Sequence, residues 1–393
     1  MSPKHPILIA GGGIAGLSLA LGLARQGSAS HILERRQAFS EAGAGIQISP
    51  NAVRALDVLG LRAALEPKAG RPREIHVHAG ASGRIVQRLP LGDWIESRHG
   101  APYLVAHRQD LQAVLLNAAQ RQPLINITTG FEVARFAEAT GIVRVHNHVG
   151  GVIECRALVG ADGILSAIRS QLHPGSAPRF AGRTAARAVL SAESVSGLID
   201  PTVTGVWLAP DSHVVHYPVR GGREIALVVI RTEDWAERGW SAPLSADALL
   251  GSLAAYAPVL REALGHAPEW RRWALFEAPA LPNWSHGPVT LIGDAAHPIL
   301  PFLAQGGALA LEDAVTLALR LAEHRDDPAA AFRAHEHQRR LRTTAIARAA
   351  KRNGQIYHLG ALRGYIRDAG LRLLPPERIM AGYDWIYGWR PDA

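Results

Sequence analysis

Cysteine is nearly absent from this chain of 393 residues, which contains only Cys155. One cysteine cannot form a disulfide within the chain, and it excludes zinc or iron–sulfur sites that need several cysteine ligands. Cys155 lies in a stretch with the pattern of a strand, so we expect a buried and unreactive thiol. Nothing here indicates an oxidising compartment, and we expect a cytoplasmic protein.

Long apolar runs are also lacking. The apolar residues 6–10 break at once into glycines, and the apolar stretch 299–311 is interrupted by proline and glycine. A membrane-spanning helix or a signal peptide needs a longer uninterrupted apolar region. We therefore expect no membrane association.

Acidic residues are fewer than basic ones: 34 Asp and Glu against 42 Lys and Arg give a net charge of +8. No basic patch with interleaved aromatic residues is evident, so we predict no nucleic-acid partner. Positive charge would instead attract anionic nicotinamide cofactors and aromatic acids. Basic residues near the C-terminus are interpreted as a solvated helix face: Arg339, Arg340, Arg342, Arg348, Lys351 and Arg352.

A glycine-rich turn is the first positive feature. Residues 7–10 have the pattern of a buried strand, and Gly11-Gly12-Gly13-Ile14-Ala15-Gly16 leads from them into an apolar helix. Gly11 permits a tight turn, Gly13 lets the backbone approach a pyrophosphate, and Gly16 lets helix and strand pack closely. The order of strand, turn and helix predicts a dinucleotide-binding unit.

A carboxylate follows at the expected place. The second predicted strand, residues 31–33, ends in Glu34. A carboxylate there accepts hydrogen bonds from a ribose and repels a 2′-phosphate. The pattern fits FAD or NAD and does not choose between them.

Two later strands also end in glycine and aspartate. Residues 157–159 lead into Gly160-Ala161-Asp162-Gly163, and residues 289–292 lead into Gly293-Asp294-Ala295-Ala296-His297-Pro298. Ligands gather at the carboxyl ends of strands in open α/β sheets. Gly306 and Gly307 then begin a helix whose free N–H groups would stabilise negative charge, which a reduced flavin would carry if the bound dinucleotide is FAD.

Together these motifs resemble the fingerprints of class A flavin-dependent aromatic hydroxylases, with the p-hydroxybenzoate hydroxylase fold, and especially the salicylate and 3-hydroxybenzoate hydroxylase group. The resemblance covers essentially the whole chain, and the run 293–314 is its most specific part. It implies an α/β fold: a Rossmann-like FAD-binding domain, an interleaved and mainly antiparallel β substrate domain, and C-terminal helices. It also implies a monooxygenase that uses NADH or NADPH and O₂ to hydroxylate a small aromatic substrate through a flavin hydroperoxide.

The resemblance suggests a discontinuous domain organisation. We expect an FAD-binding domain over 1–70, 101–178 and 279–340, a substrate-binding sheet over 71–100 and 179–278, and a helical region over 341–393. No second glycine fingerprint provides a separate nicotinamide domain, so NADH or NADPH would bind transiently.

Cofactor contacts are also carried over from the resemblance. Asp294 would bond the ribityl or phosphate-linked oxygens, and Gln47 would lie near both cofactor and substrate. His297 has no second ligand at a suitable spacing, so we predict no metal site. The expected FAD contacts are Gly11, Gly13, Ile14, Ala15, Gly16, Glu34, Arg35, Gln47, Arg108, Asp162, Gly163, Asp294, Gly306 and Gly307.

The middle of the chain has the pattern of antiparallel strands. Residues 213–218 and 224–231 predict two strands joined by a turn at Gly221-Gly222. Since side chains alternate along a strand, His213 and Tyr217 would share one face. An imidazole and a phenol there suit a phenolic substrate, one as base and one to orient the ring. The resemblance assigns catalysis to the same pair, and which of them is the base stays open.

The expected substrate pocket contains Gln47, His213, Tyr217, Pro301 and Phe302. The last two positions are polar in some relatives, so recognition of the ring here would be more hydrophobic.

Several alternatives remain open. An aromatic acid would need an arginine, and the sequence does not choose among Arg187, Arg220 and Arg231. The same fold could oxygenate a non-phenolic heterocycle or a drug-like molecule, and a non-catalytic flavin-binding protein is a further alternative. The chain could be a monomer or a homodimer.

Overall fold

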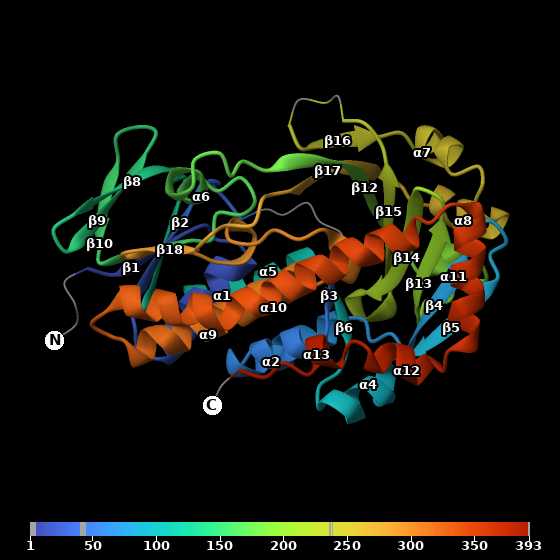
Figure 1. Ribbon diagram of the computed structural model, residues 1–393, viewed down its shortest axis with the longest axis horizontal. Coiled ribbons are helices and arrows are strands. Elements are labelled where there is room, and N and C mark those ends of the chain that lie inside the picture. Colours follow the sequence, from blue (N-terminus) through green and yellow to red (C-terminus); the bar gives the residue numbers. More distant parts are fainter. Residues whose placement is uncertain (1–4, 40–44, 236, 238, 392–393) are drawn as a thin grey trace.

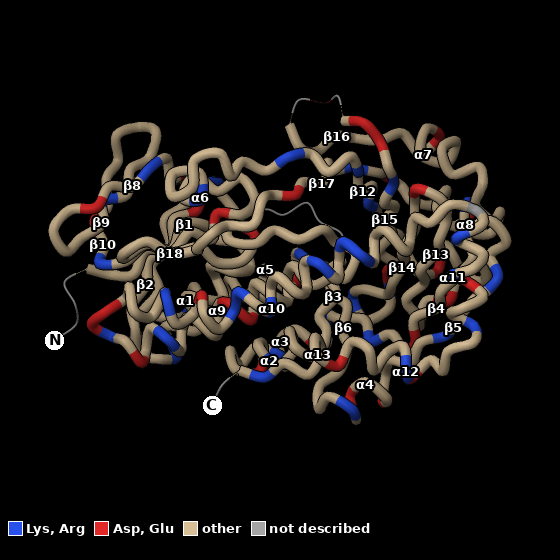
Figure 2. Tube along the Cα trace, in the orientation of Figure 1, with Lys and Arg blue, Asp and Glu red and all other residues tan. Residues whose placement is uncertain are grey.

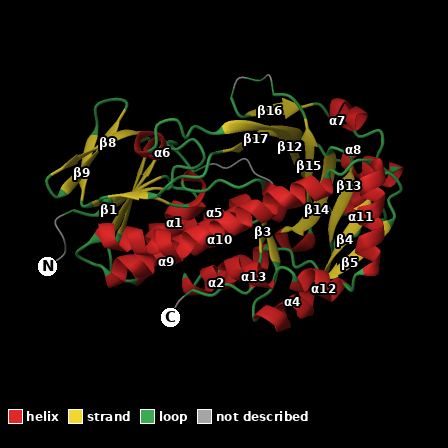
Figure 3. Ribbon diagram, viewed as in Figure 1, coloured by secondary structure: helices red, strands yellow, loops and turns green. Residues whose placement is uncertain are grey.

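The structure is a computed structural model that describes residues 5–39, 45–235, 237 and 239–391. One half is an α/β unit and the other a large, mainly antiparallel sheet, and long helices run past both (Figures 1 and 3). Mixed α/β architecture was predicted and is confirmed.

A six-stranded sheet organises the first half. The apolar residues of β1 (Ile7–Ala10) are buried at its centre, and β1 pairs in parallel with β2 and β11. Continuous apolar strands are typical of a parallel sheet covered on both faces. The strand order is β18 (Ser285–His286), β19 (Val289–Leu291), β11 (Ala157–Gly160), β1, β2 (Ser30–Glu34) and β7 (Ile125–Thr129).

The two faces of this sheet have different covers. Ile7 and Ile9 pack into a core with helices, whereas Leu8 and Ala10 pack against Cys155 and a small sheet. The helices of the first face are α1 (Ile14–Arg25), α2 (Pro50–Val58), α5 (Arg108–Gln120) and α9 (Gly306–Glu323). The second cover consists of β8 (Val133–Ala139), β9 (Ile142–Asn147), β10 (Val152–Cys155) and α6 (Ala167–Leu172).

Cys155 is fully buried, and burial raises the pKa of its thiol to about 12. The predicted burial of this thiol is confirmed, and its lack of reactivity stays a prediction.

An eight-stranded sheet organises the second half. All neighbouring strands are antiparallel except β13 and β4, and the predicted hairpin joins β14 to β15 through Arg220–Gly222. The order is β16 (Ser241–Leu244), β17 (Trp270–Glu277), β12 (Arg179–Ser191), β15 (Glu224–Thr232), β14 (Ser212–Val219), β13 (Thr204–Ala209), β4 (Glu74–Ala79) and β5 (Ile85–Pro90).

This sheet also has two dissimilar faces. One packs on α7 (Ala246–Ser252) and α8 (Pro258–Gly265). The other contacts α9, α10 (Pro328–Tyr357) and the chain end. Tyr217 on this second face belongs to the same core as Leu309 of α9, so this face is turned toward the first half of the molecule. The two-stranded sheet of β3 (Gly45–Ile48) and β6 (Leu104–His107) lies beside it.

The remaining elements follow α10 or connect the layers. After α10 the chain forms α11 (Ala361–Leu373), α12 (Pro376–Ala381) and α13 (Asp384–Tyr387), beside α4 (Gly92–His99) and β5 in Figure 1. Connecting turns form α3 (Arg62–Leu65) and, within the part of the chain that the structure describes, five 3₁₀ segments: Glu66–Lys68, Glu193–Val195, Arg220–Gly222, Gly293–Ala295 and Pro301–Leu303.

Helix α10 corrects one interpretation of the charge pattern. Arg339 does not face solvent: it is 1% exposed and pairs with Glu312 and Asp313 of α9. A buried guanidinium requires such anionic partners because desolvating an unpaired charge is costly. Elsewhere along the trace, Lys and Arg are interspersed with Asp and Glu (Figure 2).

The expected boundary between the FAD-binding domain and the C-terminal helical region, at residues 340 and 341, falls inside helix α10, which continues without a break to Tyr357. We propose that 71–100 and 179–278 act as the substrate domain, since β4, β5 and β12–β17 form one sheet.

None of the described helices is long and apolar enough to cross a membrane.

Candidate active site

The glycine turn after β1 is built by close backbone contacts. Gly11 has φ +109°, and a Cβ there would lie 2.4 Å from the carbonyl oxygen of Ala161. A Cβ on Gly16 would lie 1.9 Å from the carbonyl oxygen of Gly11. By contrast, a Cβ on Gly13 would meet no atom within 4 Å. Gly11 and Gly16 therefore form the turn, whereas Gly13 leaves space beside it.

Glu34 closes the same turn. Its Oε2 accepts a hydrogen bond from the Gly12 N–H (2.9 Å), and its Oε1 accepts one from the Arg36 N–H (2.9 Å). These bonds fix the carboxylate at the end of β2, where each oxygen retains a lone pair for a hydroxyl donor.

Two adjoining cavities follow the carboxyl ends of the parallel strands. One of about 220 Å³ lies beside Glu34 and Asp162, and one of about 290 Å³ continues past Asp294 to the second sheet. Both share Gly13, Arg108 and Asp294 as lining residues. Except for Gly16, which is buried behind the turn, every predicted cofactor residue lines one of the two.

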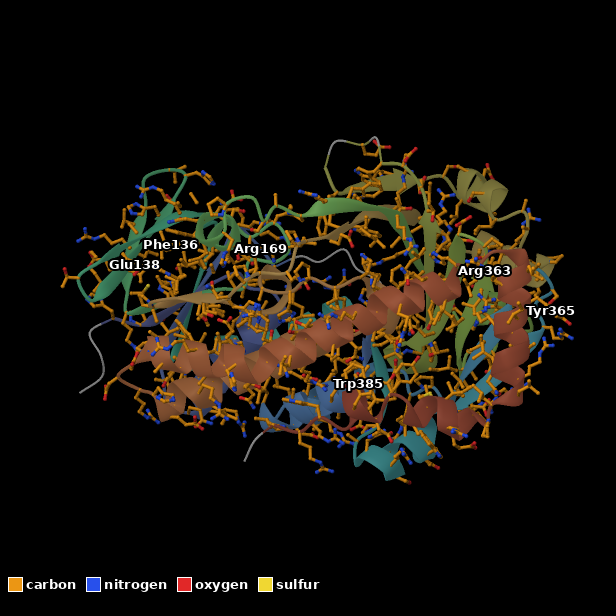
Figure 4. The ribbon with its side chains drawn as sticks, viewed as in Figure 1. Phe136, Glu138, Arg169, Arg363, Tyr365 and Trp385 are labelled. Carbon is orange, nitrogen blue, oxygen red and sulfur yellow. The ribbon has the colours of Figure 1, made fainter. Side chains whose placement is uncertain are left out.

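Asp162 and Arg169 organise the loops between these cavities. Asp162 Oδ2 accepts the N–H of Ala167 (2.9 Å), while its Oδ1 has no partner among the described residues. Arg169, labelled in Figure 4, is 1% exposed and donates to carbonyl oxygens of Pro279, Ala295 and Ala296. The sequence pattern gave Arg169 no role, because its partners are backbone carbonyl groups, one on nearby Ser176 and three more than 100 residues along the chain.

Asp313 anchors the loop that carries Asp294. Its Oδ2 accepts the Gly293 N–H (3.0 Å) and contacts His297 Nε2 (2.6 Å), while Oδ1 accepts Arg339 Nε (2.8 Å). Burial raises the pKa of Asp313, but His297 and Arg339 together bring it well below its usual range. An ionised Asp313 thus holds the loop, and His297 has a structural partner.

The start of α9 points a helix N-terminus into the larger cavity. No side chain caps this helix, and Gly306 and Gly307 line the cavity. A Cβ on Gly307 would lie 2.5 Å from Ile46 Cδ1. Uncapped backbone N–H groups at this position suit an anion.

The second sheet supplies the far wall of this cavity. His213, Val215 and Tyr217 of β14 all line it, as their shared face predicts. Across the sheet, Val215 pairs with Val228 of β15, and Val228 pairs with Arg187 of β12. Arg187 therefore lies about 10 Å, or two strand spacings, from β14 on the same face.

Tyr217 and His213 have different hydrogen-bond partners. The Tyr217 hydroxyl donates to the carbonyl oxygen of Gly45 (2.9 Å), and burial raises its pKa to about 12. His213 Nδ1 contacts His358 Nε2 at 2.7 Å. Burial, reinforced by His358 and Arg183, holds the pKa of His213 well below its usual value.

Arg187 stands apart from the other candidate arginines. Arg220 pairs with Glu224 (3.0 Å) and Arg231 with Glu233 (2.8 Å). Arg187 lines the cavity over the Trp273 ring (5.2 Å) and makes no hydrogen bond or ion pair with the described residues. Strand alternation places Arg187 on one face of β12 with Ala185 and Val189, but only the register with β15 shows that this face lines the cavity.

A third cavity of about 250 Å³ opens beyond His213 and Pro301. Phe302 lines this third cavity and not the larger one. Gln47 lies between both, and its Oε1 accepts a hydrogen bond from the Tyr103 hydroxyl. Apolar side chains and tyrosines from the chain end form most of the remaining wall.

Comparison with known proteins decides the family. Residues 4–350 match the model of the family described as FAD binding domain. The chain belongs to this family. The enzyme is a class A flavin-dependent aromatic hydroxylase, as predicted: an FAD-dependent monooxygenase that uses NAD(P)H and O₂ on a small aromatic molecule.

Two curated relatives illustrate the similarity. The chain is 34% identical to a 3-hydroxybenzoate 6-hydroxylase of Polaromonas naphthalenivorans, over 98% of this chain and 96% of the relative. It is 36% identical to a 3-amino-4-hydroxybenzoate 2-monooxygenase of Streptomyces platensis, over 98% and 96%.

Solved structures share the fold of the enzyme. Klebsiella pneumoniae HpxO, complexed with FAD and uric acid, has a TM-score of 0.87 at 24% identity, over 97% of this chain and 96% of that chain. A salicylate hydroxylase in a substrate complex has a TM-score of 0.81 at 24% identity, over 99% and 100%.

The residues of this chain fit FAD. The space beside Gly13, the unpaired Asp162 Oδ1 and the uncapped start of α9 all lie along the two adjoining cavities. When bound there, FAD supplies the redox chemistry that links NAD(P)H oxidation to the transfer of one oxygen atom from O₂.

Proposed function

We propose that this enzyme hydroxylates a phenolic aromatic acid. The observation that carries the proposal is Arg187, a cation in the cavity wall without an anionic partner. Leaving a charge unpaired away from water is costly, and a planar guanidinium matches a carboxylate. Both curated relatives described above are named for hydroxybenzoates, which carry the two groups required.

The phenol would lie against β14. With its pKa raised to about 12, Tyr217 stays protonated at neutral pH and already donates to Gly45. It therefore suits an orienting role. His213 presents an imidazole to the same cavity, and we assign it as the base that takes the phenolic proton.

The cofactor would extend from Glu34 to α9. We assign the adenosine ribose to Glu34, with Arg35 beside it, and the pyrophosphate to the turn around Gly13. Asp294 and Arg108 would contact the middle of FAD, and Gly306-Gly307 the ring that gains negative charge on reduction.

NAD(P)H oxidation by the FAD-loaded enzyme tests the proposal. The panel pairs each hydroxybenzoate isomer with the phenol that lacks its carboxylate and with benzoate, which lacks the hydroxyl. We expect strong stimulation, with a hydroxylated product, only when one ring carries both groups. Equal stimulation by the phenols that lack a carboxylate would show that the enzyme does not require an acid group on its substrate.

The third cavity favours a second candidate, a larger heterocyclic or drug-like aromatic substrate. Its space beyond Pro301 and its mostly apolar wall could receive a second ring. The same panel, extended with aryl-substituted phenols and heterocycles, separates the two. Turnover only with the extended molecules would favour the second candidate.

We also propose a cytoplasmic location, which agrees with a buried, free Cys155.

A further inference from the structure

His213 and His358 form a buried pair at the edge of the substrate cavity. His213 Nδ1 lies 2.7 Å from His358 Nε2, and the side chains are 2% and 8% exposed. His358 follows the last residue of α10, so a helix from the first half of the molecule delivers it to β14. The two positions are 145 residues apart, and no sequence pattern connects them.

The contact defines which atoms face the substrate. His213 lines both the flavin-side cavity and the third cavity, and its Nδ1 is occupied by His358. Its Nε2 makes no hydrogen bond with the described residues. Nε2 is therefore the atom that can take a proton from a substrate hydroxyl.

The surroundings disfavour a charged imidazole. Arg183 of β12 and Arg367 of α11 act on the pair as cations, while Phe302 and Tyr357 present aromatic rings to His213. The nearby anion is Asp211, which lies in the turn between β13 and β14. Burial and Arg183 lower the pKa of His358 to about 4, so both rings are neutral at neutral pH.

This creates a difficulty for a lone base. A His213 that stopped at the imidazolium stage would be a buried cation beside Arg183, and a phenol would hardly lose its proton to it. The difficulty disappears if His213 gives up its Nδ1 proton as it gains one on Nε2. Two neutral imidazoles joined by one hydrogen bond can do this, since each has one N–H and one lone pair.

We propose that His358 completes a proton relay from the substrate through His213 to a water molecule at His358 Nδ1. The inference rests on the proposed phenolic substrate. The substrate O–H bond breaks as the proton goes to His213 Nε2, and His213 Nδ1–H passes to His358 Nε2. His358 Nδ1 is buried and has no partner among the described residues. Its proton therefore passes to a water molecule that enters beside this atom, as an unsatisfied buried polar group requires. Both rings end neutral, with their tautomers exchanged, and the negative charge stays on the phenolate.

His358 does not touch the substrate and is therefore a positioning residue. His358 could act in two ways: it could hold the His213 ring in place, or it could accept the proton of that ring. Two variants distinguish these roles. In His358→Gln, the amide still accepts the His213 Nδ1–H, but an amide cannot exchange one proton for another. In His358→Ala, both functions are lost. His216→Gln is the control, because His216 is buried on the opposite face of the same strand and lines none of the three cavities.

The experiment uses the FAD-loaded enzyme and a phenolic acid that the wild type hydroxylates. Stopped-flow absorbance follows ionisation of the bound phenol between pH 6 and pH 9. We expect both His358 variants to slow ionisation by about 10²-fold at neutral pH, the usual contribution of a positioned acid or base. The rate should rise with pH in the variants and stay flat in the wild type, with little change in KM.

A nitro-substituted phenolic acid that is already ionised in solution provides the matched substrate. The variants should turn it over at the wild-type rate, and added imidazole should rescue His358→Ala with the neutral phenol. A wild-type rate and pH profile in His358→Gln would overturn the relay alone, as would equal slowing with both substrates. If the wild type hydroxylates no phenolic acid, the proposed function fails and the relay fails with it.

Discussion

Arg187 is the residue on which the proposed preference for an acidic substrate depends. It lies across the sheet from β14 in register with Val228 and Val215, and its charge has no protein partner in the described chain. A substrate carboxylate would complete this site. Loss of one partner of a desolvated charge pair costs about 2–5 kcal/mol.

Replacing Arg187 with Met should therefore lower kcat/KM for the phenolic acid by roughly 30-fold or more. The same change should hardly affect the phenol that lacks the carboxylate. Steady-state kinetics with both compounds measures the difference. Arg220→Met is the control, because Arg220 already pairs with Glu224. An equal loss for both compounds would contradict a carboxylate contact at Arg187.

Tyr217→Phe tests the orienting role of the neighbouring hydroxyl. The variant loses the donor to Gly45 and leaves that carbonyl without its partner. We expect a smaller fraction of NAD(P)H oxidation to yield hydroxylated product, because the ring is less well held. Unchanged turnover and product yield would show that Tyr217 has no such role.

At the scale of elements, the turn between β1 and α1 contains one glycine that we expect to matter for FAD binding and another that we expect to matter for folding. A Cβ on Gly13 meets no protein atom, so Gly13→Ala should leave the fold intact and obstruct only the approach of the pyrophosphate. We expect a protein with the wild-type melting temperature without FAD and a much weaker FAD affinity, measured by flavin fluorescence titration. Gly16→Ala should instead lower the melting temperature, because its Cβ would strike Gly11. Wild-type FAD affinity in Gly13→Ala would contradict the assignment.

The contact between α9 and α10 rests on a buried charge network. Removing Arg339 leaves Glu312 and Asp313 with less compensation, which should cost about 3–5 kcal/mol of unfolding free energy. Arg339→Met is compared with Arg340→Met, because the side chain of Arg340 is 45% exposed. Denaturant unfolding should place the two variants several kcal/mol apart, and equal stabilities would contradict the network.

Sequence patterns predicted what local chemistry determines and missed what packing determines. The glycine turn, the strands ending in Asp162 and Asp294, and the shared face of His213 and Tyr217 follow from neighbouring residues. Arg187 could be chosen only after strand register had placed it beside β14. His358 and the burial of Arg339 depend on where a 30-residue helix meets other elements, and no local spacing encodes that.

Across the whole molecule, buried histidines predict how stability depends on pH. Burial lowers the pKa of His335 and His358 to about 4 and that of His216 to about 3. In the unfolded chain these groups bind protons near pH 6.5, so unfolding takes up protons below that pH.

The unfolding free energy should therefore fall as the pH drops from about 6.5 toward 4, and each such histidine adds up to about 1.4 kcal/mol per pH unit. Above pH 7 this contribution is fully present and constant. Chemical denaturation at a series of pH values measures the slope, and His335→Gln should reduce it by one proton. A stability that stays flat down to pH 4 would contradict neutral buried histidines.

The central claim is that the molecule couples NAD(P)H oxidation to insertion of one oxygen atom into a phenolic acid. The most direct measurement is the mass of the product formed by the FAD-loaded enzyme under isotope-labelled O₂. The account predicts a product that carries one labelled oxygen atom on the ring, formed in proportion to the NAD(P)H consumed. NAD(P)H consumption with only hydrogen peroxide as product, across all phenolic acids, would contradict it.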